Sequence, residues 1–474
     1  MLVMKFGGTS VGDAKCFANV KEIIARAARE RPPVAVVVSA MSTVTETLLE
    51  AARLAAVGDQ KGVEQKLRYL ESKHLGLVDE LFSGSRKEAV RKTVLDVLSE
   101  FQKLCAGMSL LSELPLRALD AALSVGERLS SILLAQHLED QGIPAQSIDA
   151  VQCLITDHSF GNAKPLMDLT RDAMRRVLLP LAARNCVPII TGFLGGTREG
   201  LRTTLGRGGS DYSGAIVAAS LDADELWIWT DVDGVLSADP KMVGKAVILD
   251  ELTYEEASEL SHFGAKVLHH KTLSPLLTNM IPVYIKNTFA PEKTGTRIGP
   301  AHEGSQQGAK SVTSMAPVTL ITLRSNGNPG TTELFARTFA ALSHSTIEIL
   351  MVTQSSYQDS FCLLVPQAMA DRAKAALENA FRLELNHHYL EPFEIQQVTA
   401  IALIGEGMRG TPGVSARLFG ALAREKINII AIAQGSSESN ISLVVSVEDR
   451  NAAVEAIHRE FIAPHLAAQV SHMI

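Results

Sequence analysis

Up to residue 298 the chain alternates short apolar runs with longer amphipathic stretches. Runs without polar alternation occur at Val34 to Val38, Val187 to Thr191, Leu226 to Thr230 and Pro282 to Lys286. Such runs are typical of strands buried on both faces, and the stretches between them carry apolar residues at helical spacing. The pattern predicts an α/β fold of three layers, in which helices sandwich a mainly parallel sheet.

Two further stretches interrupt this pattern. From Val57 to Leu123 the sequence is charged and has leucines at helical intervals, which predicts a helical lobe beside the sheet. The stretch from Phe289 to Met315 is rich in Gly, Pro, Ser and Gln, which is typical of a linker. We therefore expect a catalytic domain at 1–298 and a linker at 299–315.

The rest of the chain contains an internal repeat. Ile321 to Val365 aligns without a gap with Ile401 to Val445, an offset of 80 (401 − 321), and 16 of the 45 positions are identical. Such self-similarity indicates a duplicated unit. Each copy has the pattern of a strand, a glycine loop, a helix and two more strands. This predicts two small α+β domains, at 316–395 and 396–474.

Composition narrows the functional classes. The chain has 474 residues, of which 46% are hydrophobic, enough for sizeable cores. A net charge of −7 without long basic runs argues against nucleic acid or an anionic membrane as a partner. The five cysteines are widely spaced, without a Cys-x-x-Cys pair, which is typical of reduced thiols. The start does not resemble a signal peptide and no apolar run is long enough for a membrane span, so we expect a cytoplasmic protein.

Two glycine-rich segments carry the candidate chemistry. They are Lys5-Phe6-Gly7-Gly8-Thr9-Ser10 and Gly206-Arg207-Gly208-Gly209-Ser210-Asp211, and each contains a cation and precedes a helical pattern. Glycines let backbone N–H groups approach a phosphate, and a helix N-terminus favours an anion. One such segment is more often a simple turn, but two together favour a phosphate site. Neither fits the pattern of a P-loop NTPase.

The second repeat contains a competing motif. Gly405 to Gly410 fits Gly-x-Gly-x-x-Gly between a predicted strand and helix. The acidic residue that a nicotinamide site needs after the next strand is Gln434 instead, and too little chain follows for a doubly wound sheet. We therefore reject a dinucleotide site. The doublets His269-His270 and His387-His388 lack further ligands at suitable spacing, so we expect no metal there.

Taken in order, these motifs resemble those of aspartate kinases. The matching segments are Lys5 to Ser10, Ser124 to Glu127, Leu205 to Tyr212, Trp229 to Val235 and Phe263 to His269. The resemblance covers essentially the whole chain and is greatest to the kinase half of bifunctional aspartokinase/homoserine dehydrogenases. It implies the amino-acid kinase fold, followed by two ACT-like domains. We expect no dehydrogenase module in this chain.

The resemblance implies that ATP, with Mg²⁺, phosphorylates the side-chain carboxylate of L-aspartate to 4-phospho-L-aspartate. This is the first step toward lysine, threonine and methionine. A free aspartate carboxylate has a pKa of about 3.9, so it is ionised at neutral pH and needs no general base. The reaction does need cations to offset two anions that repel each other. Lys5, Arg207 and Lys266, with Mg²⁺ on the nucleotide, would supply them.

The family motifs assign a role to each candidate residue. Lys5 and Asp211 are the expected catalytic pair, with Asp211 holding Lys5 in place. Arg207 would bind a carboxylate of the substrate, and Glu127 would accept its ammonium group. The substrate residues are Ser39, Thr45, Glu127 and Arg207. The nucleotide residues are Lys5, Gly7, Gly8, Thr9, Ser10, Thr230, Asp231, Lys241, Lys266 and Val267.

These assignments have structural alternatives. Ser39 and Thr45 could cap turns or a helix, Glu127 could be a charge on a helix surface, and Asp211 could be a helix N-cap. Leu236 stands where certain relatives have a tyrosine that packs against adenine. We therefore do not predict base stacking at that position.

The paired ACT-like domains imply feedback regulation and assembly. In each copy a glutamine, Gln354 or Gln434, ends the second strand, as in threonine-sensing relatives. We therefore expect threonine, or else lysine, as an effector. The first copy lacks at 326–330 the Gly-x-Gly-Met form that the second keeps at Gly405 to Met408, so one site could be altered. ACT-like pairs also join subunits, which implies a homodimer or a dimer of dimers.

Three alternatives remain open from the sequence. Another amino-acid kinase of the same fold would act on glutamate, N-acetylglutamate or a carbamate. A catalytically inactive sensor or partner subunit would bind threonine without turning over ATP. The ACT-like domains could also serve dimerisation alone.

Overall fold

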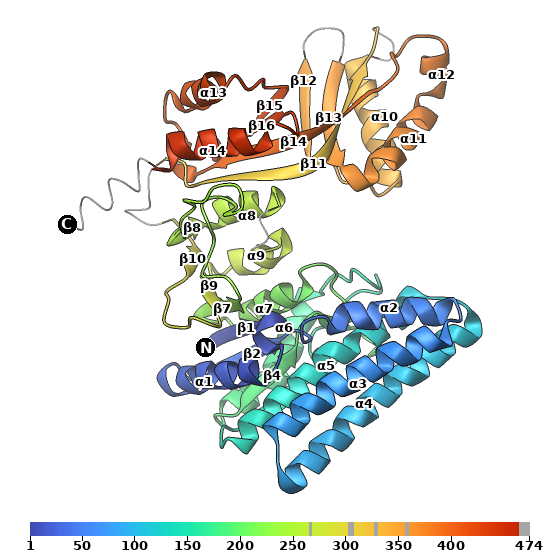
Figure 1. The fold of residues 1–474 in the computed structure, drawn as a ribbon, viewed down its shortest axis with the longest axis vertical. Coiled ribbons are helices and arrows are strands. Elements are labelled where there is room, and N and C mark those ends of the chain that lie inside the picture. The colour runs from blue at the N-terminus through green and yellow to red at the C-terminus, as the bar shows by residue number, and fades with distance from the viewer. Residues whose placement is uncertain (265–267, 302–307, 327–329, 356–359, 464–474) are drawn as a thin grey trace, which may run out of the picture. The chain divides into compact units, whose positions relative to one another are not determined.

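The structure is a computed structural model that describes residues 1–474 apart from 265–267, 302–307, 327–329, 356–359 and 464–474 (Figure 1). The chain forms two compact units. One comprises Met1–Val235, Asp250–Ser258 and Val267–His302, and the other Leu236–Leu249, Glu259–Lys266 and Glu303–Ile474. None of the helices described is at once long enough and apolar enough to cross a lipid bilayer.

An eight-stranded sheet forms the centre of the first unit. Its order is β3-β4-β2-β1-β7-β9-β10-β8, and every neighbouring pair is parallel except β9 with β10. The mainly parallel sheet expected from the apolar runs is confirmed, with the four predicted strands placed to within one residue. The strands are Leu2–Phe6 (β1), Val34–Val38 (β2), Ala145–Ile148 (β3), Val187–Thr191 (β4), Glu225–Thr230 (β7), Glu251–Thr253 (β8), Val283–Asn287 (β9) and Thr296–Gly299 (β10).

Helices cover both faces of this sheet (Figure 1). Ala14–Glu30 (α1) and Leu116–Asp140 (α5) pack against each other and on β2. Met167–Ala182 (α6) and Gly209–Ser220 (α7) pack against each other, with α6 on β4 and α7 on β1. All residues of β1 are buried, as a strand covered on both faces requires. The three-layer α/β fold is therefore confirmed.

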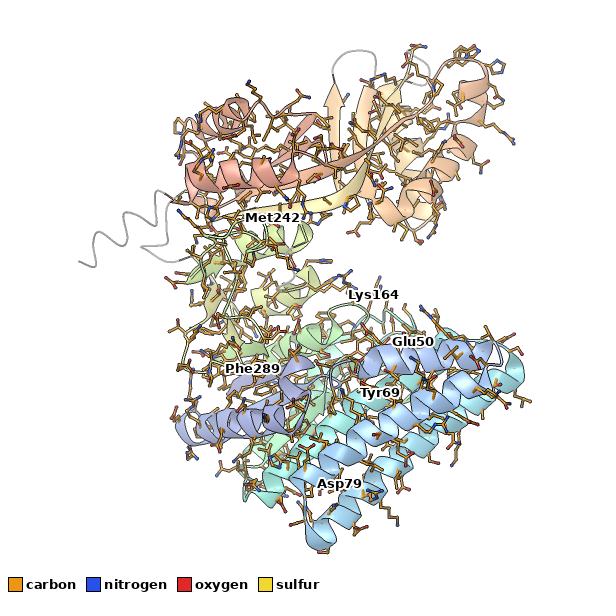
Figure 2. All side chains as sticks on the ribbon, in the orientation of Figure 1. Glu50, Tyr69, Asp79, Lys164, Met242 and Phe289 are labelled. Carbon is orange, nitrogen blue, oxygen red and sulfur yellow. The ribbon has the colours of Figure 1, made fainter. Side chains whose placement is uncertain are left out.

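Long helices form a lobe where the sequence predicted one. Leu70 and Phe101 are fully buried between these helices, because their leucines and aromatics recur at helical spacing. On the surface, Glu50 of α2 forms an ion pair with Lys66 of α3 (Figure 2). The helices of the lobe, with α5, are Val44–Ala56 (α2), Gln60–Leu81 (α3) and Gly84–Leu111 (α4).

Smaller elements complete the first unit and its connections. The hairpin of β5 and β6 lies between β4 and α7 in the chain, and α8 and α9 lie between β8 and β9. These elements are Leu194–Gly196 (β5), Arg202–Thr204 (β6), Tyr254–His262 (α8) and His270–Leu277 (α9).

The second unit holds both copies of the repeat in one antiparallel six-stranded sheet, of order β12-β13-β11-β14-β16-β15. The predicted order of strand, loop, helix, strand and strand is confirmed in each copy, and a further helix follows. The first copy contains Ser311–Arg324 (β11), Thr331–His344 (α10), Met351–Ser355 (β12), Ser360–Pro366 (β13), Ala370–Ala380 (α11) and Arg382–Asn386 (α12). The second contains Glu394–Ile404 (β14), Val414–Arg424 (α13), Ala431–Gln434 (β15), Asn440–Val445 (β16) and Arg450–Phe461 (α14).

Strand β11 joins the two copies. Its first part, from Ser311, pairs with the end of β14, and Val312 packs in the core of the second copy beside Ile401. Its later part pairs with β13, and Ile321 lies in the core of the first copy. The linker expected at 299–315 therefore overlaps the start of a buried strand, whose apolar residues follow directly on the Gly- and Gln-rich stretch.

The segment 236–249, which follows β7 in the chain, also belongs to the second unit. Ala238 and Val243 are buried in the core of the second copy. Ser237 is fully buried, and its Oγ lies 3.0 Å from Nε2 of His458 on α14. Ser314 of β11 donates a hydrogen bond to the sulfur of Met242 (Figure 2). This segment is thus a structural part of the ACT-like core.

Candidate active site

The carboxyl ends of the parallel strands meet at one edge of the first sheet. Here the Gly7 N–H donates to Trp229 O at 3.0 Å, and the Ser39 N–H donates to Phe6 O at 3.1 Å. The Gly192 N–H donates to Val38 O at 2.9 Å. These bonds tie together the loops that follow β1, β2, β4 and β7. Open α/β sheets bind their ligands at this edge.

Lys5 of β1 points to the face of the sheet that α7 covers. Side chains alternate along a strand, and Met4 and Phe6 lie in the core shared with α1. The Lys5 ammonium group lies 2.6 Å from Asp211 Oδ1 in the first turn of α7. A Cβ on Gly214 would lie only 3.2 Å from the Lys5 Cβ, so this glycine lets α7 approach closely. The structure therefore brings the two glycine-rich segments together through an ion pair.

The first glycine loop is held by its own backbone. The N–H of Gly7 donates to Trp229 O, and that of Ser10 donates to Gly7 O at 3.0 Å. Within the part of the chain that the structure describes, this leaves the N–H groups of Gly8 and Thr9 as candidate donors to a phosphate. A Cβ on Gly8 would lie 2.7 Å from Ala40 O, so only glycine fits against the loop after β2.

The Ser10 side chain has a structural position. Its hydroxyl is fully buried and lies 2.6 Å from the hydroxyl of Thr288, which follows β9. Ser10 therefore ties the loop after β1 to the loop after β9. The Ser10 hydroxyl and the Ser10 N–H thus both bind protein groups, and a contact of Ser10 with a nucleotide stays a prediction.

Glu127 lies on α5 against the loop after β2. Its side chain is almost fully buried, and Oε1 accepts a hydrogen bond of 3.2 Å from the Ala40 N–H. Among the described residues, Oε2 has no hydrogen-bond partner. Burial raises the pKa of Glu127 to about 8, although the nearby charge of Lys5 acts in the opposite direction. A Cβ on Gly126 would lie 2.7 Å from the Ala40 Cβ, so this glycine allows the contact. A buried carboxylate with an unused oxygen suits a cationic ligand.

The second glycine loop has an unusual backbone. Gly206 and Gly208 have φ angles of +77° and +72°, in the region that favours glycine, and Gly208 is the N-cap of α7. Arg207 stands between them with an exposed side chain. It forms no ion pair with any residue that the structure describes. Its guanidinium group is therefore available to an anion.

The remaining candidates of the first unit also lie at strand ends. Ser39 follows β2, and Thr45 lies in the first turn of α2; both are partly exposed. Thr230 ends β7, and its hydroxyl donates to Asp231 Oδ1 at 3.2 Å. Neither Ser39 nor Thr45 acts as a side-chain cap in the described contacts, so both hydroxyl groups remain candidates for the substrate.

The other three predicted nucleotide residues are Lys241, Lys266 and Val267, whose role stays a prediction. Lys241 is an exposed residue of the second unit, on the segment 236–249, and its N–H donates to Asp239 Oδ1 at 2.9 Å. Lys266 and Val267 lie outside the described residues. The same is true of positions 327–329 in the altered glycine loop of the first ACT-like copy.

The predicted effector residues occupy equivalent places in the two copies. Gln354 is on β12 and Gln434 ends β15, and both side chains are exposed. Gln434 lines a cavity of about 230 Å³ at the N-terminus of α13. The cavity is lined by Met408, Thr411, Gly413, Val414, Ser415, Ala416, Gln434, Glu438 and Ile441.

Asp120 was missed by the sequence reasoning. It is fully buried on α5, and its carboxylate accepts three hydrogen bonds. Two of the donors belong to Thr204, close to Arg207 in the chain. Its spacing of seven residues from Glu127 places both on one face of α5, which is the signal that could have identified it.

Family models match both units. Residues 1–287 match the amino acid kinase family, and residues 321–381 and 401–461 each match an ACT domain. The two ACT matches are 80 residues apart (401 − 321), the offset of the internal repeat.

Relatives that align with nearly the whole chain identify its family more specifically than these models do. Chloroplastic aspartokinase 1 of Arabidopsis thaliana is 32% identical over 470 residues, which cover 97% of this chain and 80% of that protein. The chain belongs to the aspartokinase family. The bifunctional aspartokinase/homoserine dehydrogenase of Haemophilus influenzae is 34% identical over 466 residues, or 97% of this chain and 56% of that protein. This aspartokinase chain spans about half the length of the bifunctional relatives from Haemophilus influenzae, Zea mays and Arabidopsis thaliana.

Solved aspartokinase structures share the fold. Escherichia coli aspartokinase III in complex with aspartate and ADP matches with a TM-score of 0.83 and 28% identity, over 97% of this chain and 99% of that one. The same enzyme with lysine and aspartate matches with a TM-score of 0.78 over 98% of this chain and 99% of that one. The expectation of an amino-acid kinase fold followed by ACT domains is confirmed.

Proposed function

We propose that this aspartokinase transfers the γ-phosphoryl group of ATP to the side-chain carboxylate of L-aspartate. A carboxylate oxygen attacks the γ-phosphorus, the bond to the bridging oxygen of ADP breaks, and 4-phospho-L-aspartate and ADP leave. The observation that carries the proposal is the ion pair between Lys5 and Asp211, which joins both glycine loops at the ligand-binding edge of the sheet.

The charges around this pair suit the charges of aspartate. The substrate has one ammonium group and two carboxylates. Glu127 offers a buried carboxylate oxygen without a partner among the described residues, which favours the ammonium group. Arg207 offers an exposed guanidinium group, which can bind the α-carboxylate through two parallel hydrogen bonds. Ser39 and Thr45 are proposed to line the same pocket.

The reacting carboxylate and the triphosphate repel each other, so positive charge must offset them. Lys5 supplies this charge, and Asp211 fixes the direction of its ammonium group. The N–H groups of Gly8 and Thr9 would add donors to the phosphates. Thr230 and Asp231 at the end of β7, and by family resemblance Gly7, Ser10, Lys241, Lys266 and Val267, complete the proposed nucleotide contacts.

We also propose Mg²⁺ as the ion that accompanies ATP. Among the described residues there is no group of three or more acidic, histidine or cysteine side chains that could hold a metal. An ion held mainly by phosphate oxygens and water, as is usual for Mg²⁺ at nucleotide sites, does not need such a group of side chains. When bound, it would neutralise charge on the phosphates.

For regulation we propose threonine, or else lysine, as an effector that binds the ACT-like domains. The cavity beside Gln434 has room for a small amino acid, and it opens at the N-terminus of α13, which favours a carboxylate. Gln354 occupies the equivalent position in the first copy, one residue before the end of β12. Assembly into a homodimer or dimer of dimers through these domains, and a place in lysine, threonine and methionine biosynthesis in the cytoplasm, belong to the same proposal.

Acyl-phosphate formation tests the proposal. Hydroxylamine traps an acyl phosphate as a hydroxamate, so purified protein is assayed with ATP and Mg²⁺ against L-aspartate, L-glutamate and N-acetyl-L-glutamate. Each substrate is tested with and without threonine or lysine. We expect turnover of aspartate alone, suppressed by threonine.

The other outcomes are informative. Turnover of glutamate or N-acetylglutamate in place of aspartate would identify a different amino-acid kinase. Threonine binding without turnover of any substrate would identify a sensor subunit. Turnover of aspartate that neither amino acid affects would leave the ACT-like domains a role in assembly only.

A further inference from the structure

We propose that Asp120 is a positioning residue, which fixes the loop that carries Arg207 to the same helix that carries Glu127. The inference rests on the proposed function, because it concerns the two groups that hold the α-carboxylate and the ammonium group of the substrate. Asp120 itself would contact neither the α-carboxylate nor the ammonium group of the substrate.

The hydrogen bonds of Asp120 are directed at one loop. Its Oδ1 accepts from the Thr204 hydroxyl at 2.7 Å, and its Oδ2 accepts from the Thr204 N–H at 3.0 Å. The same Oδ2 accepts from the Gly161 N–H at 2.9 Å. Asp120 is fully buried, and burial raises its pKa while the three hydrogen bonds act in the opposite direction. The carboxyl group is therefore fully used in binding protein groups.

Two other contacts, both from residues 161–163, hold the same loop. The Thr204 carbonyl accepts a hydrogen bond of 2.8 Å from the Ala163 N–H. A Cβ on Gly206 would lie 2.8 Å from Asn162 Oδ1 and 3.2 Å from Gly161 O. The loop 157–165, which Lys164 marks in Figure 2, therefore packs directly against the backbone next to Arg207. Asp120 links this loop, through Gly161, to the end of β6.

Helix α5 connects the two substrate groups. Seven residues separate Asp120 and Glu127, so both lie on one face, about 10 Å apart along the helix axis. Glu127 binds the Ala40 N–H near the first glycine loop, while Asp120 binds Thr204, three residues before Arg207. One rigid helix thus sets the distance between the group for the ammonium and the group for the α-carboxylate. Loss of the Asp120 contacts would release Arg207 without touching Glu127 or Lys5.

Two substitutions separate hydrogen bonding from charge. Asp120→Asn can keep all three bonds, because its amide oxygen can accept both N–H groups while its NH₂ donates to the Thr204 hydroxyl. Asp120→Ala keeps none. A matched control is Glu256→Ala, which removes another fully buried carboxylate that accepts a backbone N–H, from Thr253, in the same unit.

Kinetics give the first test. We expect Asp120→Ala to raise the KM for aspartate at least tenfold and to change the KM for ATP less than twofold, with Asp120→Asn close to the wild type. Combined with Arg207→Ala, the Asp120→Ala change should add less than twofold to the KM for aspartate. The preference for aspartate over β-alanine, which lacks the α-carboxylate, should fall by a similar factor in Asp120→Ala.

A second measurement is independent of turnover. Amide hydrogen exchange at Gly161 and Thr204 should be faster in Asp120→Ala than in Asp120→Asn or Glu256→Ala. If the wild type does not phosphorylate aspartate, the proposed function fails, and exchange together with calorimetric aspartate binding still tests the anchor. An equal rise of both KM values, an equal effect of Glu256→Ala, or a full additional effect in the Arg207→Ala background would overturn the positioning role.

Discussion

The two glycine loops look alike in sequence and differ in structure. In the first loop Gly8 has an ordinary φ of −62° and is required by close packing, because a Cβ would lie 2.7 Å from Ala40 O. In the second loop Gly206 and Gly208 have positive φ angles. The first cation, Lys5, is buried and paired with Asp211, whereas Arg207 is exposed. Similar motifs therefore place one fixed charge and one accessible charge at the site.

This difference indicates that the two loops have different roles, one in the chemical step and one in substrate binding. A buried, paired lysine is preorganised and suits charge that develops during phosphoryl transfer. An exposed arginine without an ion pair among the described residues suits a group that arrives from solution and must be bound. We therefore expect substitutions in the first loop to reduce kcat and those in the second loop to raise the KM for aspartate.

Loss of Lys5 should have the largest effect. Lys5→Met keeps the apolar stem in its buried place and removes the charge, and we expect kcat to fall by about 10³-fold or more. The rate of hydroxamate formation from aspartate measures this kcat. The exposed Lys15→Ala on α1 is the control. A folded Lys5→Met variant with kcat near the wild type would disprove the catalytic role.

Loss of Arg207 should act mainly on the substrate. We expect Arg207→Ala to raise the KM for aspartate by about 10²-fold, because truncating one partner of a charged hydrogen-bonded pair costs about 2–5 kcal/mol. Arg207→Lys should recover only part of this, since lysine cannot bind a carboxylate through a planar fork. Arg198→Ala, an exposed arginine before β6, serves as the control. An equal rise in the KM for ATP would contradict the assignment.

Glu127 should make aspartate binding depend on pH. Its pKa of about 8 in the folded protein means that the carboxyl group is largely protonated at pH 6.5 and ionised above pH 8. Only the ionised form attracts the substrate ammonium group, so the KM for aspartate should fall between pH 6.5 and 8.5. In Glu127→Gln it should be high and constant over this range. A wild-type profile as flat as that of Glu127→Gln would count against the ammonium role.

The same group should affect stability with a defined sign. The folded pKa is raised above the ordinary value of 4.5, so the folded state binds the proton more tightly than the unfolded state. The contribution of Glu127 to stability is therefore fully present below about pH 4.5 and is lost as the pH rises through about 8. Denaturation of the wild type and Glu127→Gln should show a stability difference that grows in favour of Glu127→Gln toward pH 8.5. A difference independent of pH would indicate that the carboxyl group is not buried in solution.

Most of the fold could be predicted because it follows from local patterns. Apolar runs without alternation identified the buried parallel strands, and the repeat identified both ACT-like copies. The segment 236–249 was included in the expected domain 1–298, because the contacts of Ser237 and Ala238 with β11 and α14 join positions far apart in the sequence. Long-range packing of this kind leaves no periodicity in the sequence.

The candidate site was partly accessible from the sequence. The motifs named Lys5 and Asp211, and the structure places their charged groups in contact; their catalytic role stays a prediction. The sequence could not show that the Ser10 hydroxyl is buried against Thr288, because that partner comes from a distant strand. Asp120 was missed for the same reason, since its hydrogen-bond partners Thr204 and Gly161 lie far from it in the chain.

The smallest expected effect compares the glycines themselves. Gly8→Ala should destabilise the protein by about 1–3 kcal/mol, because the new Cβ meets a backbone oxygen that cannot move alone. Gly206→Ala should cost about 1–3 kcal/mol, because a non-glycine residue is strained at a φ of +77° and its Cβ would also lie 2.8 Å from Asn162 Oδ1. Thermal unfolding of the first unit measures both, with Gly76→Ala on α3, where a Cβ meets nothing within 4 Å, as the control. Asparagine tolerates positive φ but brings the same Cβ, so Gly206→Asn should recover only the torsional part of the loss, whereas Gly8→Asn should be no better than Gly8→Ala.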